Sequence, residues 1–125
     1  MKFGYTINNK LITNAAGSLL TTDPYNYLNL PPNTFRVRTN DGQEPISGNY
    51  DSATLVEGTT DVYDVYKGGY NLGNILFASK NVIEVLGANT ENVTGMVGAF
   101  ANCYSLSSVQ LFDTSNVENM GRNVS

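Results

Sequence analysis

The sequence from Val82 to Ser125 reads VIEVLGANTENVTGMVGAFANCYSLSSVQLFDTSNVENMGRNVS. It contains a repeat, because similar residues recur 24 positions apart. Apolar positions and polar turn positions repeat together, which indicates that one structural unit occurs twice. The matching pairs are Val82 with Leu106, Val85 with Val109, Thr90 with Thr114, Asn92 with Asn116, Val93 with Val117, Met96 with Met120 and Phe100 with Val124.

A fixed period in the twenties is typical of a solenoid, in which each unit buries its apolar face only against its neighbours. We therefore expect two coils whose repeated apolar positions form the core. Two coils bury too few side chains to offset the entropy of ordering them, so we expect the repeat to pack on the preceding part of the chain. The predicted core of the repeat consists of Val82, Val85, Val93, Met96, Phe100, Leu106, Val109, Leu111, Val117 and Met120.

Three segments of the repeat carry a family resemblance: residues 92–96 (NVTGM), 100–103 (FANC) and 112–120 (FDTSNVENM). In this order they resemble the BspA-like, mycoplasma-lipoprotein-type leucine-rich repeat family. The departures are Ala99, where the family usually has Met, and the end of the sequence soon after Met120. The resemblance covers roughly the last third of the chain and implies a leucine-rich-repeat solenoid, of a kind often found in surface-exposed bacterial proteins.

A second, shorter resemblance precedes the repeat. Residues 30–38 (LPPNTFRVR) and 85–90 (VLGANT) are similar to segments that precede such repeats in proteins of gut phages, including capsid- or tail-associated ones. This similarity implies a virion structural protein.

The composition argues against several classes of function. There is no His and only one Cys, so the commonest general base, Cys/His zinc sites and an internal disulfide are excluded. The net charge is −4, without a cluster of Lys and Arg for nucleic acid. No nucleophile motif or phosphate-binding loop is present. We expect no enzyme, no cofactor and no metal site, and we expect Cys103 to be a buried core thiol.

The first ten residues, MKFGYTINNK, lack the apolar run of a signal peptide and a Cys for a lipid anchor. No segment approaches the roughly 20 apolar residues of a membrane helix. We therefore expect synthesis in the host cytoplasm and no membrane insertion. Release by cell lysis, as for phage particles, would need no export signal.

The residues before the repeat are predicted to be rich in β-structure. Short strands are expected at residues 3–7 and 10–13, at 34–39, and at 53–57 and 62–66, separated by Asn, Gly and Pro turn signals. Residues 67–69 (KGG) indicate a hinge, and a short helix capped by Asn71 is expected to extend to Ser79 and to cover the first coil. The predicted division is residues 1–67, a β-rich attachment module; 68–81, the hinge and capping helix; and 82–125, the solenoid segment. The predicted fold class is mainly β.

Two arginines are the candidate docking residues of the attachment module. In the strand at residues 34–39, alternation places Phe35 and Val37 on one face and Arg36 and Arg38 on the other. The pair is a candidate for docking to an acidic partner, against the simpler interpretation of a solvated strand face. The same alternation predicts that Asp61 and Asp64 point to opposite sides, which argues against a paired-carboxylate catalytic site.

The function expected from these features is a non-enzymatic structural protein of a bacteriophage particle, capsid- or tail-associated, which displays its repeat. Its partners would be other virion proteins or copies of itself, and a host surface receptor. The alternative is a bacterial surface adhesion module built on BspA-like repeats. Tyr-rich, weakly charged surfaces suit protein recognition in either case.

Overall fold

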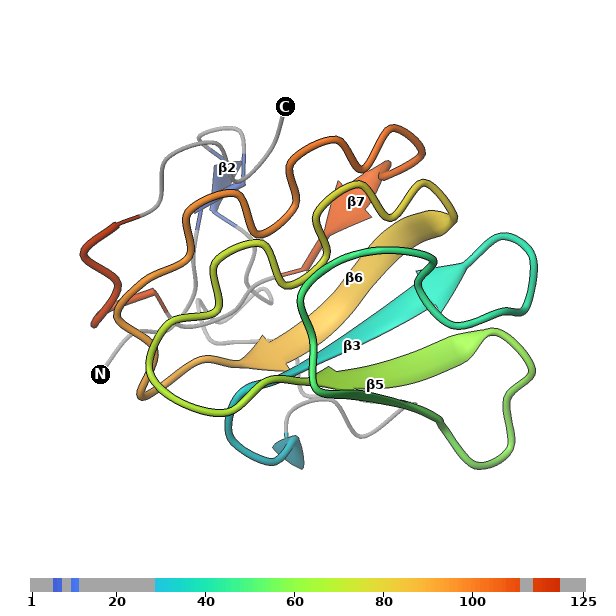
Figure 1. Cartoon of the computed structure of the whole chain (residues 1–125), viewed down its shortest axis with the longest axis horizontal. Coiled ribbons are helices and arrows are strands. Elements are labelled where there is room, and N and C mark those ends of the chain that lie inside the picture. Colours follow the sequence, from blue (N-terminus) through green and yellow to red (C-terminus); the bar gives the residue numbers. More distant parts are fainter. Residues whose placement is uncertain (1–5, 8–9, 12–28, 111–113, 120–125) are drawn as a thin grey trace.

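The computed structural model describes residues 6–7, 10–11, 29–110 and 114–119. Its main element is a five-stranded mixed sheet in the order β4-β5-β3-β6-β7, of which Figure 1 labels β5, β3, β6 and β7. A separate two-stranded sheet pairs β1 (Thr6–Ile7) with β2 (Lys10–Leu11) in antiparallel fashion, as the sequence predicts. The prediction of a mainly β fold is therefore confirmed.

The central strand is β3 (Thr34–Thr39), which has the predicted bounds. It pairs antiparallel with β5 (Val62–Tyr66) on one side and with β6 (Val82–Asn89) on the other. On the outer side of β5 lies β4 (Ser52–Leu55), again antiparallel. The sheet thus joins strands from before residue 67 to a strand after residue 81. The expected division into three parts stays a prediction, with one sheet running across its boundaries.

The 24-residue period reappears in the backbone pairing. β7 (Ser108–Val109) pairs parallel with β6, and its partners Glu84↔Ser108 and Val85↔Val109 are 24 residues apart. Isolated parallel bridges of the same spacing link Asn71 to Gly95 and Gly95 to Asn119. The repeated residues therefore lie beside one another in space.

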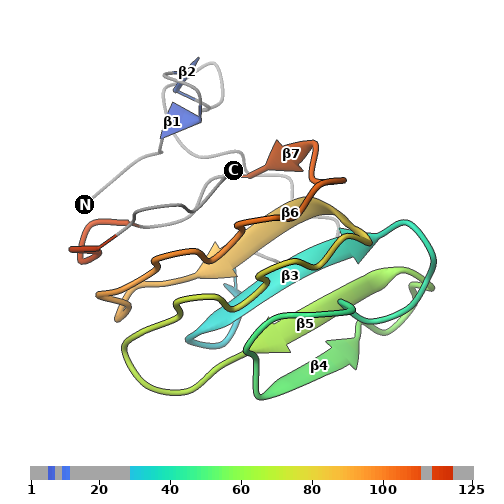
Figure 2. The same cartoon turned by 45° about the horizontal axis from the view of Figure 1, so that its top comes forward.

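The bridges belong to three turn-rich segments, which we call the first rung (residues 71–79), the second rung (95–103) and the third rung (114–119). N–H groups of the first rung donate to carbonyls of the second: Leu72 to Gly95, Asn74 to Val97, Leu76 to Ala99 and Ala78 to Ala101, with N···O distances between 2.8 and 3.0 Å. The third rung continues this pattern, since Met96 N donates to Asn119 O at 2.7 Å. Figure 2 shows the first and second rungs running side by side along one face of the sheet.

The expected capping helix at residues 71–79 is wrong, because this segment is the first rung. Asn74 and Ala78 both have φ near +60°, a left-handed conformation that an α-helix does not contain. Their counterparts 24 residues later, Gly98 and Asn102, also have positive φ. The apolar spacing that suggested a helical stripe instead matches the second rung, with Leu72 opposite Met96 and Leu76 opposite Phe100. None of the described residues forms an α-helix.

The cap of the first rung comes from the loop at residues 45–50. Gly48 of this loop lies against the backbone of the first rung, since an added Cβ would be 2.3 Å from the carbonyl oxygen of Ile75. Its φ is +118°. The side chain of Asn81 fixes the loop, since its Nδ2 donates to Glu44 O and its Oδ1 accepts the Ile46 N–H, both at 3.0 Å. A loop distant in sequence therefore covers the end of the rungs.

The hydrophobic core fills the space between the sheet and the rungs. Phe35 and Phe100 meet edge to face there, with ring centroids 5.5 Å apart. The prediction that the repeat packs on the preceding strands is confirmed. The buried members of the cluster are Phe35, Val37, Val65, Leu72, Ile75, Leu76, Val82, Val85, Val93, Met96, Ala99, Phe100 and Cys103.

Candidate interaction surface

The predicted repeat core is buried on the side nearest the sheet. Val82, Val85, Val93, Met96 and Phe100 are all buried. Leu106, Val109 and Val117 are partly buried and pack against the same cluster. The two remaining predicted core residues, Leu111 and Met120, lie outside the described residues.

Cys103 behaves as a packing residue. It is buried, and its thiol donates to Leu76 O at 3.0 Å. Desolvation by burial raises the pKa of this thiol, although a backbone hydrogen bond at Ser79 acts in the opposite direction. A raised pKa leaves little thiolate at neutral pH, which is the opposite of what a reactive cysteine needs.

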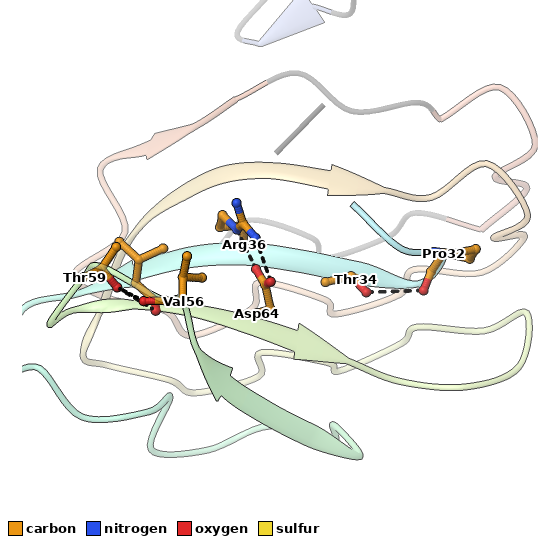
Figure 3. A network of polar contacts seen from close by, with 7 residues as sticks. Pro32, Thr34, Arg36, Val56, Thr59 and Asp64 are labelled. Atoms are coloured by element: carbon orange, nitrogen blue, oxygen red, sulfur yellow. Dashed lines mark hydrogen bonds and ion pairs between the residues drawn. The ribbon is translucent and has the colours of Figure 1, made fainter. Parts of the chain in front are cut away.

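Arg36 is held within the sheet. Its Nε and Nη2 donate to the two carboxylate oxygens of Asp64 at 2.6 and 2.7 Å (Figure 3), in the bidentate geometry of a strong ion pair. The residue is only 8% exposed, so the interpretation as a solvated strand face does not hold for it. One guanidinium nitrogen, Nη1, is buried without a hydrogen-bond partner among the described residues. Docking through Arg36 stays a prediction, and the Asp64 contact would compete with it.

Arg38 lies on the same face and is also paired. Its Nη1 donates to Glu84 Oε1 at 2.7 Å, and its Nε lies 3.4 Å from Asp61 Oδ2. Asp61 and Asp64 therefore both reach the face of the two arginines, and the expectation that they point to opposite sides is wrong. The reason is that Asp61 precedes β5 and does not follow the alternation of that strand. Both carboxylates serve as ion-pair partners within the sheet.

The rung segments and the residues flanking them carry a second group of candidate residues that sequence reasoning did not single out. Tyr70 and Tyr104 are each 70% exposed, and Phe77 and Val97 are also exposed. Lys80 Nζ lies 5.8 Å from the centroid of the Tyr104 ring, within range of a cation–π contact. The 24-residue spacing of Lys80 and Tyr104 could have indicated that they are neighbours. Exposed aromatic residues of this kind are enriched where proteins recognise partners.

Ionisable groups do not gather into a metal site in the described part of the chain. Across residues 29–110 and 114–119, no group of three or more His, Cys, Asp or Glu lies close enough together to hold a metal ion. In the same part of the chain, no helix has the length and apolar character needed to cross a membrane. The surface features that the described residues do provide are exposed aromatic side chains and the two edge strands of the five-stranded sheet, β4 and β7.

No protein-family model matches the chain, and comparisons with curated proteins and with solved structures find no match either.

Proposed function

We propose that the protein is a non-enzymatic structural protein of a bacteriophage particle, in which the strands before residue 67 attach the chain and the rungs form a short leucine-rich-repeat solenoid that is displayed. The observation that carries this proposal is the ladder of backbone hydrogen bonds at the repeat spacing, such as Leu72 N to Gly95 O and Met96 N to Asn119 O. Stacked units of one size form an extended surface, which is how solenoids bind proteins.

The sequence resemblance supports the same proposal. Two of the segments that resemble the BspA-like family belong to the part of the chain that forms these hydrogen bonds. Residues 92–96 lead into the second rung, and residues 100–103 end it. Exposed aromatic side chains on and beside the rungs, including Tyr70 and Tyr104, supply contact area for a partner. The partners would be other virion proteins, further copies of the chain or a host surface receptor.

A bacterial surface adhesion module is the alternative proposal, because the same exposed rungs would serve it equally well. The two proposals differ in where the protein is found. Density-purified phage particles and the washed envelope of uninfected host cells should therefore be compared by quantitative mass spectrometry. The virion proposal predicts this chain in the particles at a fixed ratio to the major capsid protein. Its presence only in the uninfected envelope would contradict the virion proposal and support the adhesion module.

A further inference from the structure

A small hollow lies where the loop at residues 45–50 meets the first rung. It is lined by Ser47, Gly48, Asn49, Asn74 and Phe77 and has a volume of about 250 Å³. This volume is below the roughly 300 Å³ at which pockets for drug-sized ligands begin. The hollow therefore has room for one small ring or side chain.

The walls of the hollow are held by backbone contacts on both sides. Asn49 N donates to Asn74 O at 2.9 Å, and Asn74 N donates to Val97 O at 3.0 Å. Ser47 N donates to the hydroxyl of Ser79 at 3.2 Å, and this hydroxyl donates back to Ser47 O. These contacts tie the loop to the first rung and the first rung to the second. A ligand would meet a preformed site and would not have to order a loop.

The side chains of the lining combine one aromatic ring with neutral polar groups. Phe77 is 39% exposed, which is unusual for a residue of its size in a rung whose other large apolar side chains are fully buried. The side-chain amides of Asn49 and Asn74 and the hydroxyl of Ser47 form no hydrogen bond with the described residues. Each amide offers both donors and an acceptor.

We infer that this hollow binds one neutral sugar ring, as part of a glycan. The electron-rich face of Phe77 suits the polarised C–H groups on the apolar face of a sugar, as it suits the edge of another ring. The amide of Asn49 and the Nδ2 group of Asn74 can pair with ring hydroxyls, which also donate and accept. The Oδ1 atom of Asn74 lies against Gly98 of the second rung. The lining contains no charged side chain, so it provides no counter-charge for a phosphate, nucleotide or carboxylate.

This inference goes beyond the proposed function and does not depend on it. The direct test is a titration of the purified, ¹⁵N-labelled full chain with single free sugars: glucose, galactose, mannose, rhamnose, N-acetylglucosamine and N-acetylgalactosamine. We expect at least one of them to shift the side-chain amide signals of Asn49 and Asn74 saturably. Saturation transfer from the protein should reach the ring protons of the same sugar.

Two variants and one control make the test specific. Phe77→Ala should weaken binding of that sugar about tenfold, the size expected from losing one aromatic contact. Ala101 occupies the equivalent place in the second rung, so alanine is compatible with this backbone. Asn74→Gly removes the amide and keeps a residue suited to φ of +60°. Tyr66→Ala removes an exposed aromatic ring outside the hollow and should leave binding unchanged.

Three results would overturn the inference. They are the absence of saturable shifts with every sugar, shifts confined to residues away from the hollow, and unchanged binding by Phe77→Ala and Asn74→Gly. The inference would also be contradicted if a protein ligand occupied the hollow and no sugar shifted the signals of its lining residues. None of these results bears on whether the chain is part of a phage particle, which mass spectrometry of particles decides separately.

Discussion

At the scale of single residues, Tyr50 shows how the loop that covers the first rung is fastened. Its hydroxyl lies within donor distance of Pro45 O at 2.7 Å and of Glu44 Oε2 at 2.9 Å. Desolvation by burial, followed by the hydrogen bond and charge of Glu44, raises the pKa of Tyr50 from 10.0 to about 12. The folded protein therefore holds this proton more tightly than the unfolded chain does.

The raised pKa of Tyr50 predicts a loss of stability at alkaline pH. Because the unfolded state ionises first, the contribution of Tyr50 is fully present below pH 10 and is lost as the pH rises toward about 12. A spectrophotometric titration of the native protein should show tyrosinate formation that extends to about pH 12. Tyr50→Phe should remove the part of this titration that extends to about pH 12. The free energy of unfolding of this variant should also fall less steeply between pH 10 and about 12. An unchanged late transition in that variant would contradict the assignment.

Gly48 tests the close contact between the cap and the first rung. Alanine there would combine a φ of +118° with a Cβ only 2.3 Å from Ile75 O. We expect Gly48→Ala to lower the free energy of unfolding by about 3 kcal/mol or more. Gly58 is the matched control, since its φ is +83° and no atom of the described residues lies within 4 Å of an added Cβ. Gly58→Ala should cost only about 1 to 2 kcal/mol. Equal shifts of the urea midpoint in the two variants would rule out the close contact.

At the scale of elements, β3 is the strand on which the others depend. It is the middle strand of the five and pairs antiparallel with β5 and β6, and one of its faces contributes Phe35 and Val37 to the core. Its other face carries the two arginines, whose partners come from β5 and β6. The ion pairs therefore reinforce the same pairings that the backbone makes.

The two arginine pairs should differ in energy because they differ in burial. The side chains of Arg36 and Asp64 are 10% and 26% exposed, and removal of the carboxylate would leave a buried guanidinium without its partner. Asp64→Asn should therefore lower the free energy of unfolding by about 3 kcal/mol. Glu84→Gln, at a pair whose arginine is 23% exposed and keeps Asp61 as a partner, should cost about 1 kcal/mol or less. Urea unfolding of both variants measures the difference, and a larger loss in Glu84→Gln would refute it.

The sequence predicts most of the strands and misses the first rung. Alternation in residues 34–39 and 62–66 gives β3 and β5 their exact bounds. In residues 71–79, Leu72, Ile75 and Leu76 have the spacing of a helical stripe, and this local pattern competes with the 24-residue period. The period was the better guide, since Leu72 and Leu76 lie opposite Met96 and Phe100. Residues 71–79 are a further copy of the repeat unit, but they have Leu where the second rung has Met96 and Phe100, and this difference conceals the similarity.

The candidate site residues likewise have contacts that the sequence pattern does not predict. Sequence alternation correctly places Arg36 and Arg38 on one face but does not reveal their acidic partners, which are 23 to 46 residues distant. The hollow joins Asn49 to Asn74 and Phe77, which are ordinary turn and apolar residues in the sequence. Contacts between segments so far apart depend on tertiary packing, and no local pattern records them.

At the scale of the whole molecule, the sheet and the rungs share one core. Phe35, Val37 and Val65 from the strands pack in the same cluster as Met96 and Phe100 from the second rung. Neither part can bury its apolar face without the other. The molecule should therefore fold cooperatively across residue 67.

A truncation tests this shared core. Residues 68–125 expressed alone should give the amide spectrum of an unfolded chain, because they lack β3 and β5. In the full chain, Phe35→Ala should lower the free energy of unfolding by about 3 to 5 kcal/mol. Well-dispersed amide signals from the truncated chain would mean that the rungs form an independent domain.

The loop over the first rung also determines how copies of the protein can associate. Stacked parallel units have two different ends, and units of this kind can polymerise head to tail into open filaments if both ends are accessible. Gly48 and Asn49 lie directly on the first rung, where an incoming copy would have to add its own rung. Filament growth at this end would first require the loop to detach. The loop at residues 45–50 therefore works against open-ended, head-to-tail growth from this end.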